Sequence, residues 1–152
     1  MSTRSILARY TLNDPNNPSA WEGRYCHWDG YPSHMGVQLR WIVSRDGYKL
    51  AGDTIMKHEW SAMDAQRTPL EWKELYPSED WNIVAGYGTA YNTNDGYIYT
   101  HDDAEALSNS WCEFLYIITP ENTIDVFTIE DGKIVPYGES IRADLPMEMV
   151  KQ

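Results

Sequence analysis

The chain has 152 residues, of which 42% are hydrophobic, and it carries seven Trp and eleven Tyr. This length suits one compact domain, and so many large side chains can build a core without disulfides or a structural metal, which excludes a disordered chain. The formal net charge of −11 is repelled by nucleic acid and by anionic membranes, so neither is expected as a direct partner.

Two extended segments are predicted near the N-terminus. Residues 5–12 are rich in strand formers and are followed by a loop dense in turn residues at 13–18. Residues 21–28 resume an extended pattern that ends at Asp29-Gly30. We therefore expect the two segments to pair as an antiparallel hairpin.

Helices are predicted in the middle of the chain. Ser33 resembles an N-cap, which indicates a helix over about 33–45. Residues 48–51 resemble a short second helix that Gly52 would end. Residues 68–75 begin with Thr-Pro-Leu-Glu, a pattern typical of another short helix.

The second half of the chain is dominated by predicted strands. The pattern indicates strands at 81–85 and 97–100. Residues 111–118, 123–129 and 133–137 are separated by turn residues and predict a three-stranded meander. The simplest architecture is a single α+β domain spanning the whole chain, with a mostly antiparallel sheet and short central helices packed on one face.

The N-terminal residues and the two cysteines bear on the cellular location. The chain opens with no basic and then apolar leader, and no apolar run approaches the roughly 18 residues of a membrane span. Cys26 and Cys112 both fall in predicted strands among aromatic residues, where a buried, reduced thiol is the usual state. We expect a cytoplasmic protein.

The most distinctive segment is residues 24–32, RYCHWDGYP, at the junction between the second strand and the first helix. Backbone N–H groups at a helix start favour an anion, tryptophan and tyrosine rings stack on other rings, and arginine binds phosphate. The alternative is that the same aromatic residues belong to the core. The candidate ligand-binding residues are Arg4, Arg24, His27, Trp28, Asp29 and Tyr31.

The opening MSTRS and the segment YCHWDGYP, with Gly36 following it, resemble an uncharacterised family of small bacteriophage and prophage proteins. Residues 50–53 and 88–91 resemble further family landmarks more loosely, and about a quarter of the chain is covered. The resemblance implies a phage or prophage origin, hence the cytoplasm of a host cell, and implies no established activity.

Two histidines, His27 and His101, are the candidates for catalysis or metal binding. His27 and Asp29 resemble an acid-base pair, but no nucleophile elbow accompanies them, and His101 with Asp102 matches no metal motif. We expect no catalytic residue, no metal and no cofactor, and the sequence leans against enzyme activity. Glu113, the lone charge in the predicted strand 111–118, is a secondary site candidate.

The preferred hypothesis is a phage anti-defence protein that sequesters a nucleotide-derived immune signal without cleaving it. The first alternative is an acidic, nucleic-acid-mimicking inhibitor of a host defence nuclease or other nucleic-acid-binding protein. It follows from the charge distribution, because residues 1–70 hold eight Lys or Arg and seven Asp or Glu, whereas residues 71–152 hold four and sixteen. The second alternative is a nucleotide phosphoester hydrolase. The tryptophans would also suit an interface between copies, which leaves a homo-oligomer open.

Overall fold

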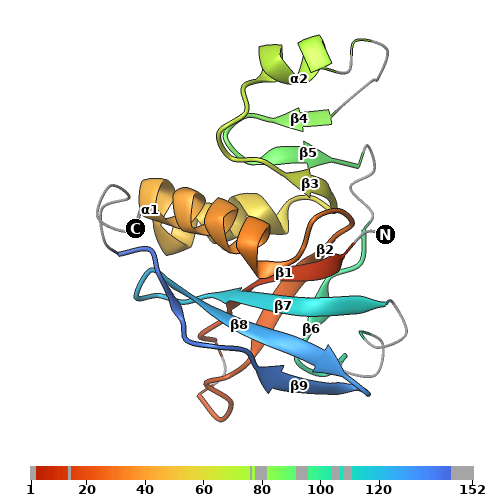
Figure 1. The fold of residues 1–152 in the computed structure, drawn as a ribbon. Coiled ribbons are helices and arrows are strands. Elements are labelled where there is room, and N and C mark those ends of the chain that lie inside the picture. The colour runs from red at the N-terminus through yellow and green to blue at the C-terminus, as the bar shows by residue number, and fades with distance from the viewer. Residues whose placement is uncertain are drawn as a thin grey trace.

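The computed structural model describes residues 3–13, 15–75, 77, 82–91, 96–103, 107 and 111–144. Within these residues ten strands form one sheet, accompanied by the helices α1 and α2 (Figure 1). The elements in chain order are β1 (Arg4–Tyr10), β2 (Trp21–Cys26), α1 (Pro32–Met56), β3 (Trp60–Met63), α2 (Pro69–Leu75), β4 (Asn82–Val84), β5 (Gly88–Ala90), β6 (Tyr99–Thr100), β7 (Cys112–Ile118), β8 (Thr123–Glu130), β9 (Lys133–Pro136) and β10 (Ile141–Arg142).

The predicted hairpin and the predicted meander are both confirmed. β1 and β2 pair antiparallel from Ser5 opposite Cys26 to Tyr10 opposite Trp21. β7, β8 and β9 pair antiparallel in succession. A parallel pairing between β1 and β7 joins the hairpin to the meander, so strands from the two ends of the chain form a continuous sheet.

The sheet runs in the order β10-β8-β7-β1-β2-β3-β5-β4, with β6 also paired to β2 and β9 to β8. Most pairings are antiparallel, as expected, and the parallel ones are β1 with β7 and β2 with β3. The strands predicted at 81–85 and 97–100 correspond to β4 and β6, although Trp81 lies outside the described residues. β3, β5 and β10 were not predicted.

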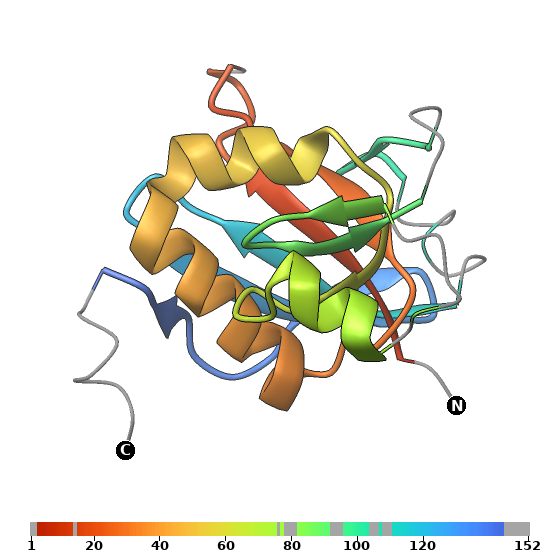
Figure 2. The same cartoon turned by 90° about the horizontal axis from the view of Figure 1, so that it is seen from above.

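α1 differs from the predicted helix pair at both ends. The helix begins at Pro32 with Tyr31 as its N-cap, so Ser33 is inside the helix and the predicted cap is wrong. Gly47 interrupts the helix with a φ of 81°, a conformation that glycine adopts at little cost. The second half then continues through Gly52 to Met56. The two halves run in different directions, as Figure 2 shows.

Side chains fix the helix ends where the sequence predicts caps and breaks. After the Gly47 kink, the Tyr48 N–H donates to Oδ1 of Asn122 at 2.9 Å, which satisfies a backbone donor at the restarted helix. In α2 the predicted start is confirmed as a capping box, because the backbone N–H groups of Thr68 and Glu71 each donate to the other residue's side chain. The expected short length holds for α2, with seven residues, but not for α1, with 25.

Two apolar clusters lie on opposite faces of the sheet. On one face, α1 contacts β1, β2, β7, β8 and β10 and buries residues such as Leu39 and Ile42 against Leu7 and Tyr116. The other face carries a smaller cluster built around Ile6. Both cysteines are buried as thiols and form no disulfide. Among the described residues, neither helix combines the length and apolar composition needed to cross a bilayer.

Candidate functional site

The junction between β2 and α1 is held in place by backbone hydrogen bonds. The Trp28 N–H donates to the carbonyl of Ser61 at 2.9 Å, and the Gly30 N–H donates to the carbonyl of Thr3 at 2.8 Å. Between them Asp29 adopts a φ of 55°, a left-handed conformation that Asp tolerates better than most residues. A Cβ on Gly30 would lie 2.6 Å from Oγ of Ser5, so glycine allows the junction to pack this closely.

A cavity of about 530 Å³ opens beside this junction. Its walls come from the 28–34 segment, from β3 and the turn after it, from α2 and from β5. We call it the Trp28 cavity, and its lining residues are Trp28, Asp29, His34, Ser61, Ala62, Met63, Asp64, Arg67, Trp72 and Thr89. Its volume lies within the range typical of small-molecule sites.

Arg67 organises one wall of the Trp28 cavity. Its guanidinium lies 4.7 Å from the centre of the Trp72 ring, in cation–π geometry. Its Nε lies 3.2 Å from Oδ2 of Asp64, and its backbone N–H donates to Oδ1 of Asp64 at 3.2 Å. Both oxygens of Asp64 are therefore engaged by Arg67.

Polar groups on the other walls differ in whether they have hydrogen-bond partners within the protein. His34 Nε2 donates to the carbonyl of Met63 at 2.9 Å, which requires this nitrogen to carry a proton. Thr89 is fully buried, and its hydroxyl has no hydrogen-bond partner among the described residues. Asp29 makes no hydrogen bond or ion pair through its carboxylate with any described residue. The cavity therefore offers the Asp29 carboxylate to a ligand, whereas the unsatisfied Thr89 hydroxyl lies buried within its wall.

The structure brings together only some of the predicted site residues. Trp28 and Asp29 line the Trp28 cavity, and the exposed side chain of Trp28 excludes the alternative that it is core. Tyr31 is also exposed, and its ring centre lies 6.0 Å from that of His34 on the cavity wall. These three residues therefore lie in one region at the cavity.

Arg4 and His27 lie next to this region but do not line the cavity. The hydroxyl of Tyr25 lies 2.8 Å from Nδ1 of His27, and the His27 ring meets Trp28 edge-on with centres 4.7 Å apart. Burial and the nearby charge of Arg4 both lower the pKa of His27. Burial raises the pKa of Tyr25 to about 12. The cluster therefore favours a neutral imidazole.

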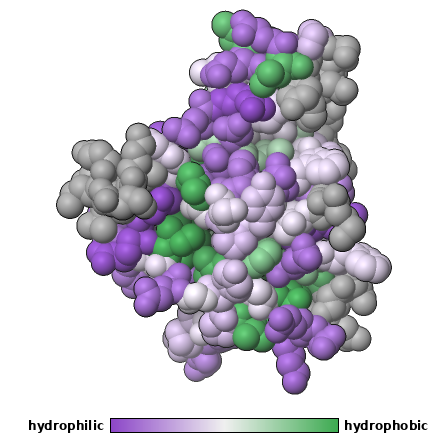
Figure 3. All heavy atoms as spheres, in the orientation of Figure 1, coloured by the Kyte–Doolittle hydropathy of each residue, from purple (hydrophilic) through white to green (hydrophobic). Residues whose placement is uncertain are grey.

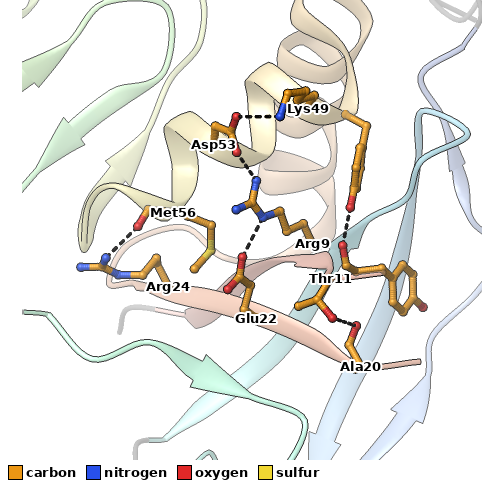
Figure 4. A network of polar contacts seen from close by, with 10 residues as sticks. Arg9, Thr11, Ala20, Glu22, Arg24, Lys49, Asp53 and Met56 are labelled. Carbon is orange, nitrogen blue, oxygen red and sulfur yellow. Dashed lines mark hydrogen bonds and ion pairs between the residues drawn. The ribbon is translucent and has the colours of Figure 1, made fainter. Parts of the chain in front are cut away.

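Arg24 points to the opposite face of the sheet from Tyr25. Its Nη1 donates to the carbonyl of Met56 at 2.8 Å, at the end of α1 (Figure 4). Only 3% of the residue is exposed, and burial lowers the pKa of its guanidinium while nearby Glu59 opposes that shift. A cation at a helix C-terminus stabilises the helix dipole, so Arg24 has a structural role in this position.

A second hollow of about 440 Å³ lies between the first loop and the second half of α1. Arg9 crosses it, with an ion pair to Glu22 at 2.8 Å and a second to Asp53, which also lies 3.7 Å from Lys49 (Figure 4). Because its charges are already paired with one another, this hollow is a weaker ligand site than the Trp28 cavity.

The remaining sequence candidates form no catalytic group in the structure. His101 lies 3.6 Å from Asp102, its neighbour in the chain. No group of three His, Cys, Asp or Glu side chains within the described residues is placed to hold a metal ion. Glu113 is exposed and is the extra residue where the pairing of β1 with β7 shifts between Arg4 and Ser5.

Sequence reasoning missed the cavity residues that come from β3, the following turn, α2 and β5. Asp64 and Arg67 are three residues apart, just before a predicted helix, and this spacing could have indicated their ion pair. No local pattern could have indicated Thr89, because its position depends on the pairing of β5 with the distant strand β3. Figure 3 shows hydrophobic atoms among hydrophilic ones in the region of α2. Two leucines of this helix, Leu70 and Leu75, are exposed.

The chain matches no protein-family model, no curated protein and no solved structure.

Proposed function

We propose that the chain binds a nucleotide-derived small molecule without cleaving it and holds the base of that molecule in the Trp28 cavity. The observation that carries this proposal is a cavity of about 530 Å³ whose walls include the rings of Trp28 and Trp72. Flat aromatic walls suit a nucleobase, since stacking of one base on an aromatic side chain contributes roughly 1–3 kcal/mol.

The net charge of the protein favours binding of the ligand through its base rather than through its phosphates. A protein with a formal net charge of −11 repels a polyphosphate approaching from solution. Within the cavity, the Arg67 cation is offset by Asp64, and Asp29 adds a further negative charge. The base therefore enters the cavity while the phosphates remain at its solvent-exposed mouth, where the terminal N–H groups of Arg67 can contact them.

Binding without cleavage is supported by the chemistry of the walls. Hydroxyl groups become nucleophiles when a general base accepts their proton. Within the described part of the chain, no hydrogen bond joins His34 to the hydroxyl of Ser61 or Thr89, and His34 Nε2 is occupied by a backbone carbonyl. The resemblance to phage proteins provides the biological setting that we propose, namely removal of an immune signal from the host cytoplasm.

Calorimetry on two tryptophan variants tests the proposal. Wild-type protein is titrated with guanosine and adenosine monophosphates, cyclic mono- and dinucleotides and ADP-ribose. Trp28→Ala should weaken binding of the best ligand about tenfold, the loss of one stacking contact. Trp111→Ala is the matched control, because Trp111 is 77% exposed and does not line the cavity. No heat with any ligand at millimolar concentration, or equal losses in the two variants, would contradict the proposal.

A further inference from the structure

The base that the Trp28 cavity accepts can be inferred from its polar groups, and this inference rests on the proposed function. We propose that the cavity is selective for guanine, with the Asp29 carboxylate accepting hydrogen bonds from N1–H and the exocyclic N2 amino group. A carboxylate offers two acceptor oxygens side by side, and the guanine edge offers two adjacent donors.

Asp29, rather than Asp64, is the carboxylate available for this contact. Asp64 is engaged at both oxygens by Arg67, at 3.2 Å each. Asp29 lines the same cavity but makes no hydrogen bond or ion pair with any described residue. A ligand donor facing Asp29 therefore gains a charge-assisted hydrogen bond without breaking an existing one.

The backbone fixes the position of Asp29 before a ligand arrives. Its φ of 55° is held between the Trp28 hydrogen bond to Ser61 and the Gly30 hydrogen bond to Thr3. Trp28 and Asp29 line the same cavity, so a base stacked on that ring occupies the space that the carboxylate faces. Preorganisation of this kind reduces the entropy lost on binding.

The second group that points to a ligand is the hydroxyl of Thr89. It is fully buried on the cavity wall and has no partner among the described residues, a condition that costs free energy until a partner arrives. A small shift of the Thr89 side chain would let its hydroxyl donate to the O6 or N7 acceptor of guanine. Adenine instead presents the lone pair of N1 beside its amino group, and the Asp29 carboxylate would repel that lone pair.

Calorimetry with three nucleotides on the wild-type protein provides the first test. Guanosine monophosphate should bind about tenfold more tightly than inosine monophosphate, which lacks the N2 amino group, and adenosine monophosphate should bind more weakly still. Equal affinities for the three, with binding still weakened by Trp28→Ala, would overturn guanine selectivity but leave the proposed function intact. No binding of any nucleotide would overturn both.

A change of specificity in Asp29→Asn provides the second test. Asparagine tolerates the left-handed backbone and preserves the side-chain shape, but its amide N–H can face O2 of xanthine. Asp29→Asn should weaken the binding of guanosine monophosphate about tenfold or more. It should strengthen the binding of xanthosine monophosphate relative to wild type. Asp102→Asn, at an exposed carboxylate outside the cavity, should change neither affinity. Unchanged guanosine monophosphate affinity in Asp29→Asn, measured on protein with wild-type thermal unfolding, would overturn the inference.

Discussion

The two parts of the sheet differ in how firmly they are held together. β8, β7, β1 and β2 pair over long stretches, from Ser5 to Tyr10 between β1 and β2 alone, and their buried face packs against α1. β3, β5 and β4 are three or four residues long. The register of β3 with β2 covers one pair, Cys26 opposite Trp60, and two further backbone hydrogen bonds, to the carbonyls of Trp60 and Ser61, extend it into the junction. The long-stranded part therefore provides most of the buried apolar contact, and the short-stranded part is attached to it.

The Trp28 cavity lies where these two parts meet. Trp28, Asp29 and His34 come from the long-stranded side, whereas Arg67 and Trp72 come from the short-stranded side. A molecule bound in the cavity would contact both and stabilise their attachment. The stability of the fold and the shape of the site therefore depend on different residues, and variants can separate the two.

The largest effect is expected from Leu39→Ala in the long-stranded part. Leu39 is fully buried between α1 and the sheet, so removing its side chain should lower the free energy of unfolding by about 2–5 kcal/mol. Urea unfolding measures the change. Leu70→Ala is the control in the short-stranded part, because Leu70 is 66% exposed, and its effect should stay within about 0.5 kcal/mol. Similar losses in both variants would show that the two parts are equally important for stability.

An intermediate effect is expected from Gly30→Ala at the boundary between the parts. The added Cβ would lie 2.6 Å from Oγ of Ser5 and 2.9 Å from the carbonyl of Thr3, so the junction must shift. We expect a loss of about 1–3 kcal/mol in unfolding free energy and weaker nucleotide binding. Gly36→Ala is the control, because its Cβ would approach the tip of the Ile141 side chain, which can move. Normal stability and binding in Gly30→Ala would show that the junction tolerates displacement.

The smallest effect on the free energy of unfolding is expected from protonation of His58, which lies at the same boundary, between α1 and β3. Burial and the charges of Arg24 and Lys57 lower the pKa of His58 below the ordinary value for histidine, about 6.5, so the native protein favours the neutral imidazole. Stability is therefore greatest above about pH 6.5, the ordinary pKa of histidine in an unfolded chain, and it falls as the pH is lowered from there towards the depressed native pKa, where the loss is complete. Urea unfolding at pH 7.5 and 5.5 should show this decrease, and His58→Gln should reduce it. An identical decrease in the variant would assign it to another group, such as His27, whose pKa is also lowered.

Elements with local signals could be predicted from the sequence. Alternating strand formers with turns between them gave the hairpin and the meander, and the Thr68 capping box gave α2. Ser33 was mistaken for an N-cap because serine is a frequent cap, whereas Pro32 already occupies the first turn. Gly52 was mistaken for a helix end, but the helix continues there and Arg9 packs against it.

Elements that depend on tertiary pairing could not be predicted. β3 and β5 are short and contain Ser, Ala and Gly, so only their antiparallel pairing makes them strands. The same dependence hid most of the cavity wall: Trp28 and Asp29 could be predicted, but Trp72 and Thr89 reach the site through long-range contacts. Arg24 and His27 are separated because side chains alternate between the faces of a strand.

Mass spectrometry of the protein incubated with a mixture of nucleotides tests binding without cleavage most directly. The protein is separated from free nucleotides by rapid gel filtration, and the bound and released species are identified before and after denaturation. We expect an intact guanine-containing molecule to be recovered from the wild-type protein after denaturation and to be depleted in Trp28→Ala. A chemically altered product, or equal recovery from the two proteins, would contradict it.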